Sequence, residues 1–240
     1  MKRVLYLVQS CNEPGYTAEE DVVRETWGKD AEVVFYKARP DIGEPCLEGD
    51  TLYVDAPDDI DGTYAKTMEA LNWAFNGGRY NYVVRTNTSH WINTPAINSW
   101  IQQRNDADDR LHGGFTVHLA HGPYKGLFFL NGGLLVISRT CYCNHLAAAW
   151  DKDANCVDDV MIGETLRRHF GRRYKDWMVP HQELLLYKYH QGDRYMYMRY
   201  WAIRLKDHWH NEHLDAPRQY VTDRMREIDH KIREGHGRDC

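Results

Sequence analysis

Two adjacent carboxylates, Asp158 and Asp159, are the residues of this sequence best suited to proton transfer. They open a stretch of helical pattern, 158–168, in which neighbouring side chains point about 100° apart around the helix axis. One of the two can cap the helix, because the helix dipole favours an anion there, while the other faces a substrate. A carboxylate held beside a hydroxyl can remove its proton as a general base. We therefore predict that Asp159, with Asp158 second, is the catalytic residue.

Polar residues also follow an apolar strand, Tyr80 to Arg85, which ends in Thr86-Asn87-Thr88-Ser89. Polar side chains at the carboxyl end of a strand in a parallel sheet can contact a ligand. An ordinary transition from strand to loop explains the same pattern, and this segment alone does not separate the two interpretations.

Two further segments place special residues beside predicted elements. Gly132 and Gly133 lead into an apolar strand that ends at Ser138, and paired glycines let another backbone or a sugar approach closely. Asp58 and Asp59 precede a helical pattern over 63–75, and for them we favour helix capping over metal binding.

Two histidine- or cysteine-containing segments are weaker candidates for zinc sites. Cys141 and Cys143 with His145 lack the second cysteine pair of a typical zinc site. The segment from His208 to His213 does not place three ligands on one face of a helix. We therefore predict no metal site in either segment.

Strand and helix patterns alternate along most of the chain, and this order predicts a mostly parallel sheet with helices on both faces. Ligands of such sheets bind at the carboxyl ends of strands, which directs attention to 9–12, 85–89 and 130–133. The predicted strands are 4–8, 31–36, 51–54, 80–85, 114–119 and 133–138. The predicted helices are 17–27 capped by Thr17, 63–75, 94–103, 141–149, 158–168 and a charged helix at 217–234 with a solvated, salt-bridged face.

Composition limits the class of protein. The chain has 240 residues, of which 42% are hydrophobic and 27% charged, which suits one α/β domain and excludes a disordered or fibrous chain. The formal charge of −5 disfavours a nucleic-acid partner, because nucleic acid is itself strongly negative. No apolar run reaches the ~20 residues of a membrane span. Six cysteines without a secretory signal are typical of reduced thiols, so we expect a cytoplasmic location.

In their order and spacing, these segments resemble the inverting beta-1,3-galactosyltransferase and Fringe-like family of GT-A glycosyltransferases. The resemblance covers about residues 3–170. It implies a GT-A-like, Rossmann-like α/β fold with a C-terminal helical extension, and a hexosyltransferase-like, inverting activity on a UDP-sugar. The segments that carry it are Arg24-Glu25-Thr26-Trp27, the acidic turn and helix from Asp58 to Leu71 with Trp73, the strand end at 85–88, the glycine-led strand 131–138, and Asp158-Asp159-Val160 with Gly163.

One departure from the family concerns the metal. The family's Asp-x-Asp motif, which holds a divalent ion on the donor diphosphate, falls at Thr86-Asn87-Thr88, where no carboxylate is present. Neutral oxygens are weak ligands for Mg or Mn, so a divalent cofactor is not expected. The charge of the leaving diphosphate would instead be stabilised by Lys66, Arg85 or the tail segment 188–194, which contains His190.

The resemblance also implies which residues bind the donor, and which partners the protein has. The partners are a nucleotide-sugar donor and a glycan or other hydroxyl acceptor. The expected domains are 1–175, which binds the nucleotide sugar, and 176–240, an extension packed on it. The expected donor-binding residues are Ser10, Asn12, Arg24, Lys66, Arg85, Thr86, Asn87, Gly132, Gly133 and His190.

A second interpretation is a non-catalytic protein of the same fold that binds a sugar or a nucleotide sugar. The missing Asp-x-Asp motif favours it, whereas Asp158 and Asp159 oppose it, because a binding protein needs no base. A hydroxylated DNA base is a third type of acceptor, which the acidic composition disfavours.

Overall fold

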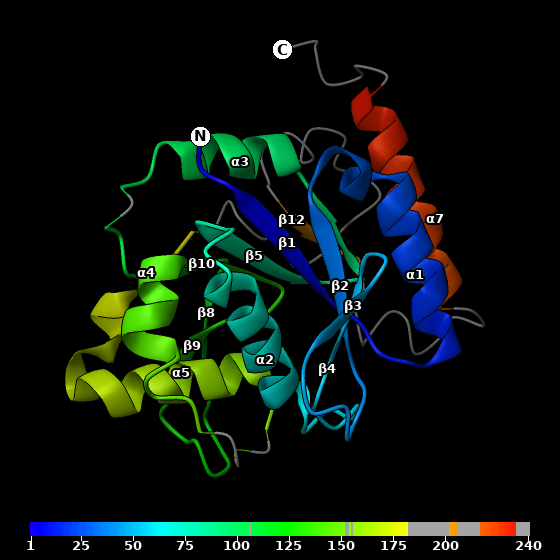
Figure 1. Ribbon diagram of the computed structural model, residues 1–240. Coiled ribbons are helices and arrows are strands. Elements are labelled where there is room, and N and C mark those ends of the chain that lie inside the picture. The colour runs from blue at the N-terminus through cyan, green and yellow to red at the C-terminus, as the bar shows by residue number, and fades with distance from the viewer. Residues whose placement is uncertain (106, 152–153, 155, 182–201, 206–216, 234–240) are drawn as a thin grey trace.

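The computed structural model describes residues 1–105, 107–151, 154, 156–181, 202–205 and 217–233. In these residues the central element is an eight-stranded sheet in the order β11-β7-β10-β5-β1-β2-β4-β3 (Figure 1). Its strands are β1 (Val4–Gln9), β2 (Val33–Ala38), β3 (Cys46–Glu48), β4 (Thr51–Val54), β5 (Tyr82–Asn87), β7 (Leu111–Gly113), β10 (Leu134–Ser138) and β11 (Met178–Pro180).

The strand directions explain why one edge of the sheet collects polar residues. Strands β5, β1, β2 and β4 are parallel, whereas β10 is antiparallel to β5, with Leu134 opposite Thr86 and Ser138 opposite Tyr82. The amino end of β10 therefore lies beside the carboxyl ends of β1 and β5. This mostly parallel sheet, flanked by helices, confirms the predicted α/β class.

Helices cover both faces of the sheet, because successive side chains of a strand point to opposite faces. On one face Leu5 and Leu7 of β1 share a core with the helices α2 (Thr63–Asn76) and α5 (Asp158–Phe170). On the other face Tyr6 and Val8 share a core with α1 (Pro14–Glu25), α3 (Thr94–Gln102) and α7 (Pro217–Arg233). The shorter elements are the helix α4 (Arg139–Cys141), a π-helical turn at Tyr142–Leu146, and 3-10 turns at Trp27–Asp30 and Gly171–Trp177.

The described parts of the C-terminal extension pack on the sheet domain. Helix α7 lies along α1 in Figure 1, and the ion pair between Arg226 and Glu25 (3.0 Å) joins them. Val221, Met225 and Ile228 of α7 are buried in the second core, while charged side chains of the same helix form ion pairs such as Arg233–Asp229. A short strand, β12 (Ala202–Arg204), pairs with β6 (His90–Ile92). The boundary at 175 stays a prediction.

Some predicted element boundaries are wrong for local reasons. Helix α1 begins at Pro14 and not at Thr17, since proline suits the first turn, where its missing N–H has no partner to lose. Asn93 caps α3 by accepting the N–H of Ala96 at 3.2 Å. Of the strand predicted at 114–119 only β8 (Thr116–His118) forms, in a hairpin with β9 (Phe128–Leu130) and outside the main sheet. The helix predicted at 141–149 is largely the π-helical turn.

None of the helices in the described part of the chain is both long and apolar enough to span a membrane.

Candidate active site

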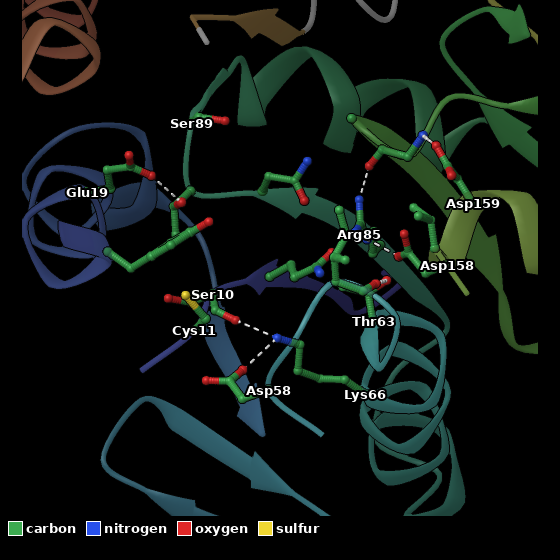
Figure 2. Close-up of a pocket in the computed structure, with 18 of the residues that line it drawn as sticks. Ser10, Cys11, Glu19, Asp58, Thr63, Lys66, Arg85, Ser89, Asp158 and Asp159 are labelled. Atoms are coloured by element: carbon green, nitrogen blue, oxygen red, sulfur yellow. Dashed lines mark hydrogen bonds and ion pairs between the residues drawn. The ribbon is translucent and has the colours of Figure 1, made fainter. Parts of the chain in front are cut away.

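A cavity of about 500 Å³ opens at the edge where β1 and β5 end and β10 begins (Figure 2). The amino ends of α2 and α5 also reach it. Figure 2 shows Asp158 and Asp159 on one side of the cavity and Glu19 on the opposite side. The lining residues are Gln9, Ser10, Cys11, Glu13, Tyr16, Glu19, Asp58, Asp59, Ile60, Thr63, Lys66, Arg85, Asn87, Thr88, Ser89, Asn131, Gly132, Gly133, Val157, Asp158, Asp159 and Arg204.

Asp159 is the carboxylate of this cavity whose exposure and pKa best suit proton transfer. Its side chain is partly exposed, and its Oδ2 accepts the N–H of Gly132 at 2.8 Å. Burial, followed by the charge of Asp158, raises the pKa of Asp159 to about 6, although the Gly132 N–H and Arg85 act in the opposite direction. A carboxylate with a pKa near 6 is ionised at neutral pH and is a stronger base than an ordinary aspartate.

Asp158 has a different environment from its neighbour. It is 3% exposed, and one of its oxygens, Oδ2, lies 2.7 Å from the Arg85 guanidinium and accepts the hydroxyl of Thr67 at 2.9 Å. Because this oxygen is already paired inside the protein, Asp158 is less available to a substrate than Asp159. Asp158 lies in the first turn of α5, but its main partner is Arg85 and not the backbone N–H groups of the helix start.

Arg85 lines the cavity, but its guanidinium is engaged by the protein itself. The residue is 2% exposed, donates to the hydroxyl of Tyr36 at 3.2 Å and to the carbonyl of Gly132, and pairs with Asp158. The expectation that Arg85 faces the donor diphosphate is therefore not supported by the position of its nitrogens. Hydrogen bonds from all three nitrogens direct the guanidinium inward.

Lys66 is a basic residue of α2 that lines the cavity beside Ser10 and Asp58 (Figure 2). Its Nζ donates to the carbonyl of Ser10 at 2.9 Å and to Asp58 Oδ1 at 3.0 Å. Asp58 Oδ2 also accepts the backbone and side-chain N–H groups of Asn12, both at 2.8 Å. Asp58 is thus a partner of Lys66 and not a helix cap, while Asp59 accepts the N–H of Gly62 at 2.6 Å in the turn before α2.

The end of β5 does not supply the oxygens that a divalent metal prefers. Thr86 is buried and donates to the carbonyl of Gly133 at 2.9 Å, and Thr88 donates to the carboxylate of Glu19. Asn87 lines the cavity with a neutral amide. Within the described ranges, no three His, Cys, Asp or Glu side chains are grouped so as to hold a metal ion. The residues present do not fit the metal that the family resemblance implies, and we derive no step through one.

The glycines before β10 make room for the protein's own side chains. A Cβ on Gly132 would lie 3.1 Å from Arg85 Nη1 and 3.1 Å from Asp159 Oδ2. Such contacts are tight, so a larger residue here would displace either the guanidinium or the carboxylate. Gly132 and Gly133 both line the cavity.

The structure does not bring every predicted donor-binding residue to the cavity. Arg24 is outside it: its Nε lies 2.7 Å from Asp50 Oδ2, and its Nη1 pairs with Asp21 at 2.8 Å. Asn12 and Thr86 do not line the cavity but contact residues that do. Ser10 lines it, although its hydroxyl donates to Glu20. His190 and the tail segment 188–194 lie outside the described residues.

Sequence reasoning missed three residues at the side of the cavity opposite Asp159. Glu19 is 2% exposed and pairs with Arg218 of α7 at 3.0 Å. The Arg218 guanidinium also lies 3.9 Å from the centre of the Tyr16 ring. Only the spacing of Val221, Met225 and Ile228 in α7 hints that this helix is packed; nothing local identifies its partner.

The predicted absence of zinc sites can be examined at one of the two segments. Cys141 is buried and Cys143 exposed, so their side chains differ in direction, and His145 Nε2 lies 3.1 Å from Asp109 Oδ2. The segment 208–213 lies outside the described residues.

Comparison with known proteins gives a likeness in structure only. No family model matches the chain, and no curated protein sequence matches it. A solved structure titled as a glycosyltransferase involved in the glycosylation of the major capsid of PBCV-1 is similar, with a TM-score of 0.48 and 10% sequence identity. The match covers 94% of this chain and 99% of that chain. At this identity, the function has to be inferred from the residues of the cavity.

Proposed function

We propose that this protein is a glycosyltransferase that moves a sugar from a nucleoside-diphosphate sugar, UDP-linked, to an acceptor hydroxyl with inversion at the anomeric carbon. The observation that carries the proposal is Asp159, a partly exposed carboxylate that a backbone N–H from Gly132 holds at 2.8 Å. It lies in a cavity at the carboxyl ends of β1 and β5, where ligands of parallel sheets bind.

In this reaction Asp159 takes the proton of the acceptor hydroxyl as the hydroxyl oxygen attacks the anomeric carbon. The bond from that carbon to the diphosphate breaks on the opposite face of the sugar, so the configuration inverts in a single displacement. A pKa of about 6 leaves Asp159 ionised at neutral pH and still able to accept a proton in the transition state.

Lys66 and the amino end of α2 support the proposal at the leaving group. Thr63, the first residue of α2, lines the cavity three residues before Lys66, and helix amino ends favour anions. Binding of a diphosphate would exchange Asp58 for phosphate oxygens on the Lys66 ammonium. The ammonium would then stabilise the charge that develops on the departing diphosphate.

The experiment that tests the proposal has two steps. A thermal-shift screen of UDP-, GDP-, dTDP- and CMP-sugars identifies the donor, because a ligand that binds only the folded state raises Tm. Transfer or hydrolysis of that donor is then followed by release of the nucleoside diphosphate. We expect one nucleotide class to stabilise the protein and to be turned over, with the sugar product in the inverted configuration. Retained configuration, or stabilisation by none of the donors, would contradict the proposal.

A non-catalytic nucleotide-sugar-binding protein is the second candidate. Two observations favour it: the basic groups Lys66 and Arg85 are already paired with carboxylates, and the end of β5 has no carboxylate. A binding protein would be stabilised by the same donor yet would release no nucleoside diphosphate over many hours. Turnover that is lost in Asp159→Asn would exclude it.

A further inference from the structure

A closed ring of hydrogen bonds lies directly behind the cavity, and it joins four buried side chains from four elements. Arg85 of β5 donates to the hydroxyl of Tyr36 of β2 at 3.2 Å, and Tyr36 bonds the hydroxyl of Thr67 of α2 at 2.9 Å. Thr67 donates to Asp158 of α5 at 2.9 Å, and Asp158 pairs with Arg85 at 2.7 Å. None of the four is more than 3% exposed.

The chemistry of Arg85 and Asp158 fixes the direction of every hydrogen bond in this ring. A guanidinium only donates hydrogen bonds and a carboxylate only accepts them. Tyr36 must therefore accept from Arg85 and donate to Thr67, and Thr67 must donate to Asp158. Because each hydroxyl hydrogen has one assigned acceptor, removal of either hydroxyl leaves a buried donor or acceptor without its partner.

The ring connects to Asp159 through Gly132. Arg85 Nη1 donates to the carbonyl of Gly132, and the N–H of the same glycine donates to Asp159 Oδ2 at 2.8 Å. The lack of a Cβ lets Gly132 fit between the guanidinium and the carboxylate, where an added Cβ would be 3.1 Å from each. A shift of the Arg85 guanidinium would therefore move Gly132 and release the carboxylate of Asp159.

We propose that Tyr36 and Thr67, which do not line the cavity, are positioning residues: they lock the Arg85–Asp158 pair and, through Gly132, hold the carboxylate of Asp159 toward the substrate. This inference rests on the proposed function of Asp159 as the base. It assigns the two hydroxyls an effect on turnover rather than on donor affinity, because neither touches the cavity.

The test uses Tyr36→Phe and Thr67→Val, which remove the hydroxyls with little change of shape, in the full chain. We expect kcat to fall about 10-fold to 100-fold in each variant, since small displacements of a catalytic group have effects of this size. KM for the donor should stay within about 2-fold, as for an interaction made only in the transition state. The double variant should be no slower than the slower single variant, because both break the same ring. Thr67→Ser, which keeps the hydroxyl, should restore kcat.

Tyr64→Phe is the matched control. Tyr64 is buried on the same helix, α2, and its hydroxyl bonds Thr165 of α5 at 2.9 Å, away from Arg85 and Asp158. This variant should lower Tm about as much as Tyr36→Phe and leave kcat unchanged. An equal loss of kcat in the control, or wild-type kcat in both ring variants, would overturn the proposal.

A second measurement needs no turnover and separates failure of the ring from failure of the proposed function. The sequence contains two Asn–Gly pairs, 76–77 and 131–132, so chain labelled with 13C-carbonyl Asn and 15N-Gly gives two amide signals. The Gly132 amide should titrate with Asp159 in the wild type and stop doing so in Asp159→Asn. In Tyr36→Phe and Thr67→Val the amplitude should fall well below that of the Tyr64→Phe control. An unchanged amplitude would contradict the ring, whereas a changed amplitude in a protein that transfers no sugar would contradict only the proposed function.

Discussion

At the scale of single residues, the two neighbouring aspartates have different environments and therefore different expected roles. Asp158 is buried against Arg85, whereas Asp159 is partly exposed to the cavity. Neighbouring helical positions point about 100° apart, so Asp158 can face the protein interior while Asp159 faces the cavity. The pKa of Asp159 is raised because burial and the charge of Asp158 disfavour its ionised form.

Asp159→Asn should abolish transfer and leave donor binding nearly intact. Asparagine keeps the shape and one hydrogen-bond acceptor but cannot take a proton, so turnover should fall by about 10²–10⁴. Donor affinity, measured by calorimetry, should change by less than about 2-fold. Full activity in this variant would remove Asp159 from the mechanism.

Asp158→Asn gives the comparison at the buried position. It leaves the Arg85 charge without its carboxylate, and breaking a buried ion pair typically costs about 3–5 kcal/mol of the free energy of unfolding. We therefore expect a large fall in the denaturant midpoint, in contrast to Asp159→Asn. Equal stability of Asp158→Asn and wild type would show that the pair is not formed.

The raised pKa of Asp159 also predicts how stability depends on pH. The folded state binds this proton more tightly than the unfolded state, whose carboxyl has the ordinary value of 3.8. The ionised group therefore destabilises the fold above about pH 6, and this effect is relieved as the pH falls from 6 toward 4. Asp159→Asn should accordingly raise Tm at pH 7 and lose that advantage near pH 4, which thermal melts at both pH values can measure. A Tm difference that does not change with pH would contradict the shift.

The sequence predicted candidate residues by type better than it predicted their partners. Asp159 and Lys66 line the cavity, because each lies near the start of a helix that reaches the same edge of the sheet. Arg24 and Arg85 were expected at the donor, but both pair with carboxylates of the protein, Asp50 and Asp158. Such pairs join residues far apart in sequence, and a single sequence carries no local signal for them.

At the scale of elements, the carboxyl end of strand β5 brings no carboxylate to the cavity. Its end carries Thr86, Asn87 and Thr88, and the hydroxyls of both threonines already have acceptors within the protein. The strands and helices around it were predicted from their apolar patterns, which are strong in buried strands. The three-residue strands β3, β6, β7, β9, β11 and β12 were not predicted, because so short a segment shows no periodicity.

Donor binding is expected to be independent of divalent ions because of this strand end. The donor found in the thermal-shift screen would be titrated in EDTA and again with added Mn. Affinities should agree within about 10-fold, or about 1.4 kcal/mol. The same titrations of Lys66→Met should show weaker donor binding both in EDTA and with Mn, because the variant lacks the ammonium that contacts the diphosphate. A larger loss on chelation would require metal ligands other than the Thr86–Thr88 side chains.

At the scale of the whole molecule, the C-terminal extension completes the second core. Met225 and Ile228 of α7 are buried with Val22 and Val23 of α1, and Ala202 and Ile203 of β12 are in the same core. The apolar positions 221, 225 and 228 follow the helical repeat, and the charges between them predict a solvated, salt-bridged face on the same helix. The same helix sends Arg218 to Glu19, so it also reaches a residue that lines the cavity.

The extension is therefore expected to depend on the sheet domain for its fold, and limited proteolysis can test this dependence. The described apolar residues of 180–240 are buried in one core together with residues of α1 and β6, so their burial depends on the sheet domain. Cleavage near residue 180 should yield a C-terminal fragment that is degraded further once it separates. The remaining fragment, 1–180, should lose thermal stability, because Val22 and Val23 would become exposed to water. As a control, Ile228→Ala in the uncut chain should lower the free energy of unfolding by about 2–5 kcal/mol, as for other large-to-small changes in a core. A stable, protease-resistant fragment of 180–240 with helical circular dichroism would contradict this dependence and make the extension a domain in its own right.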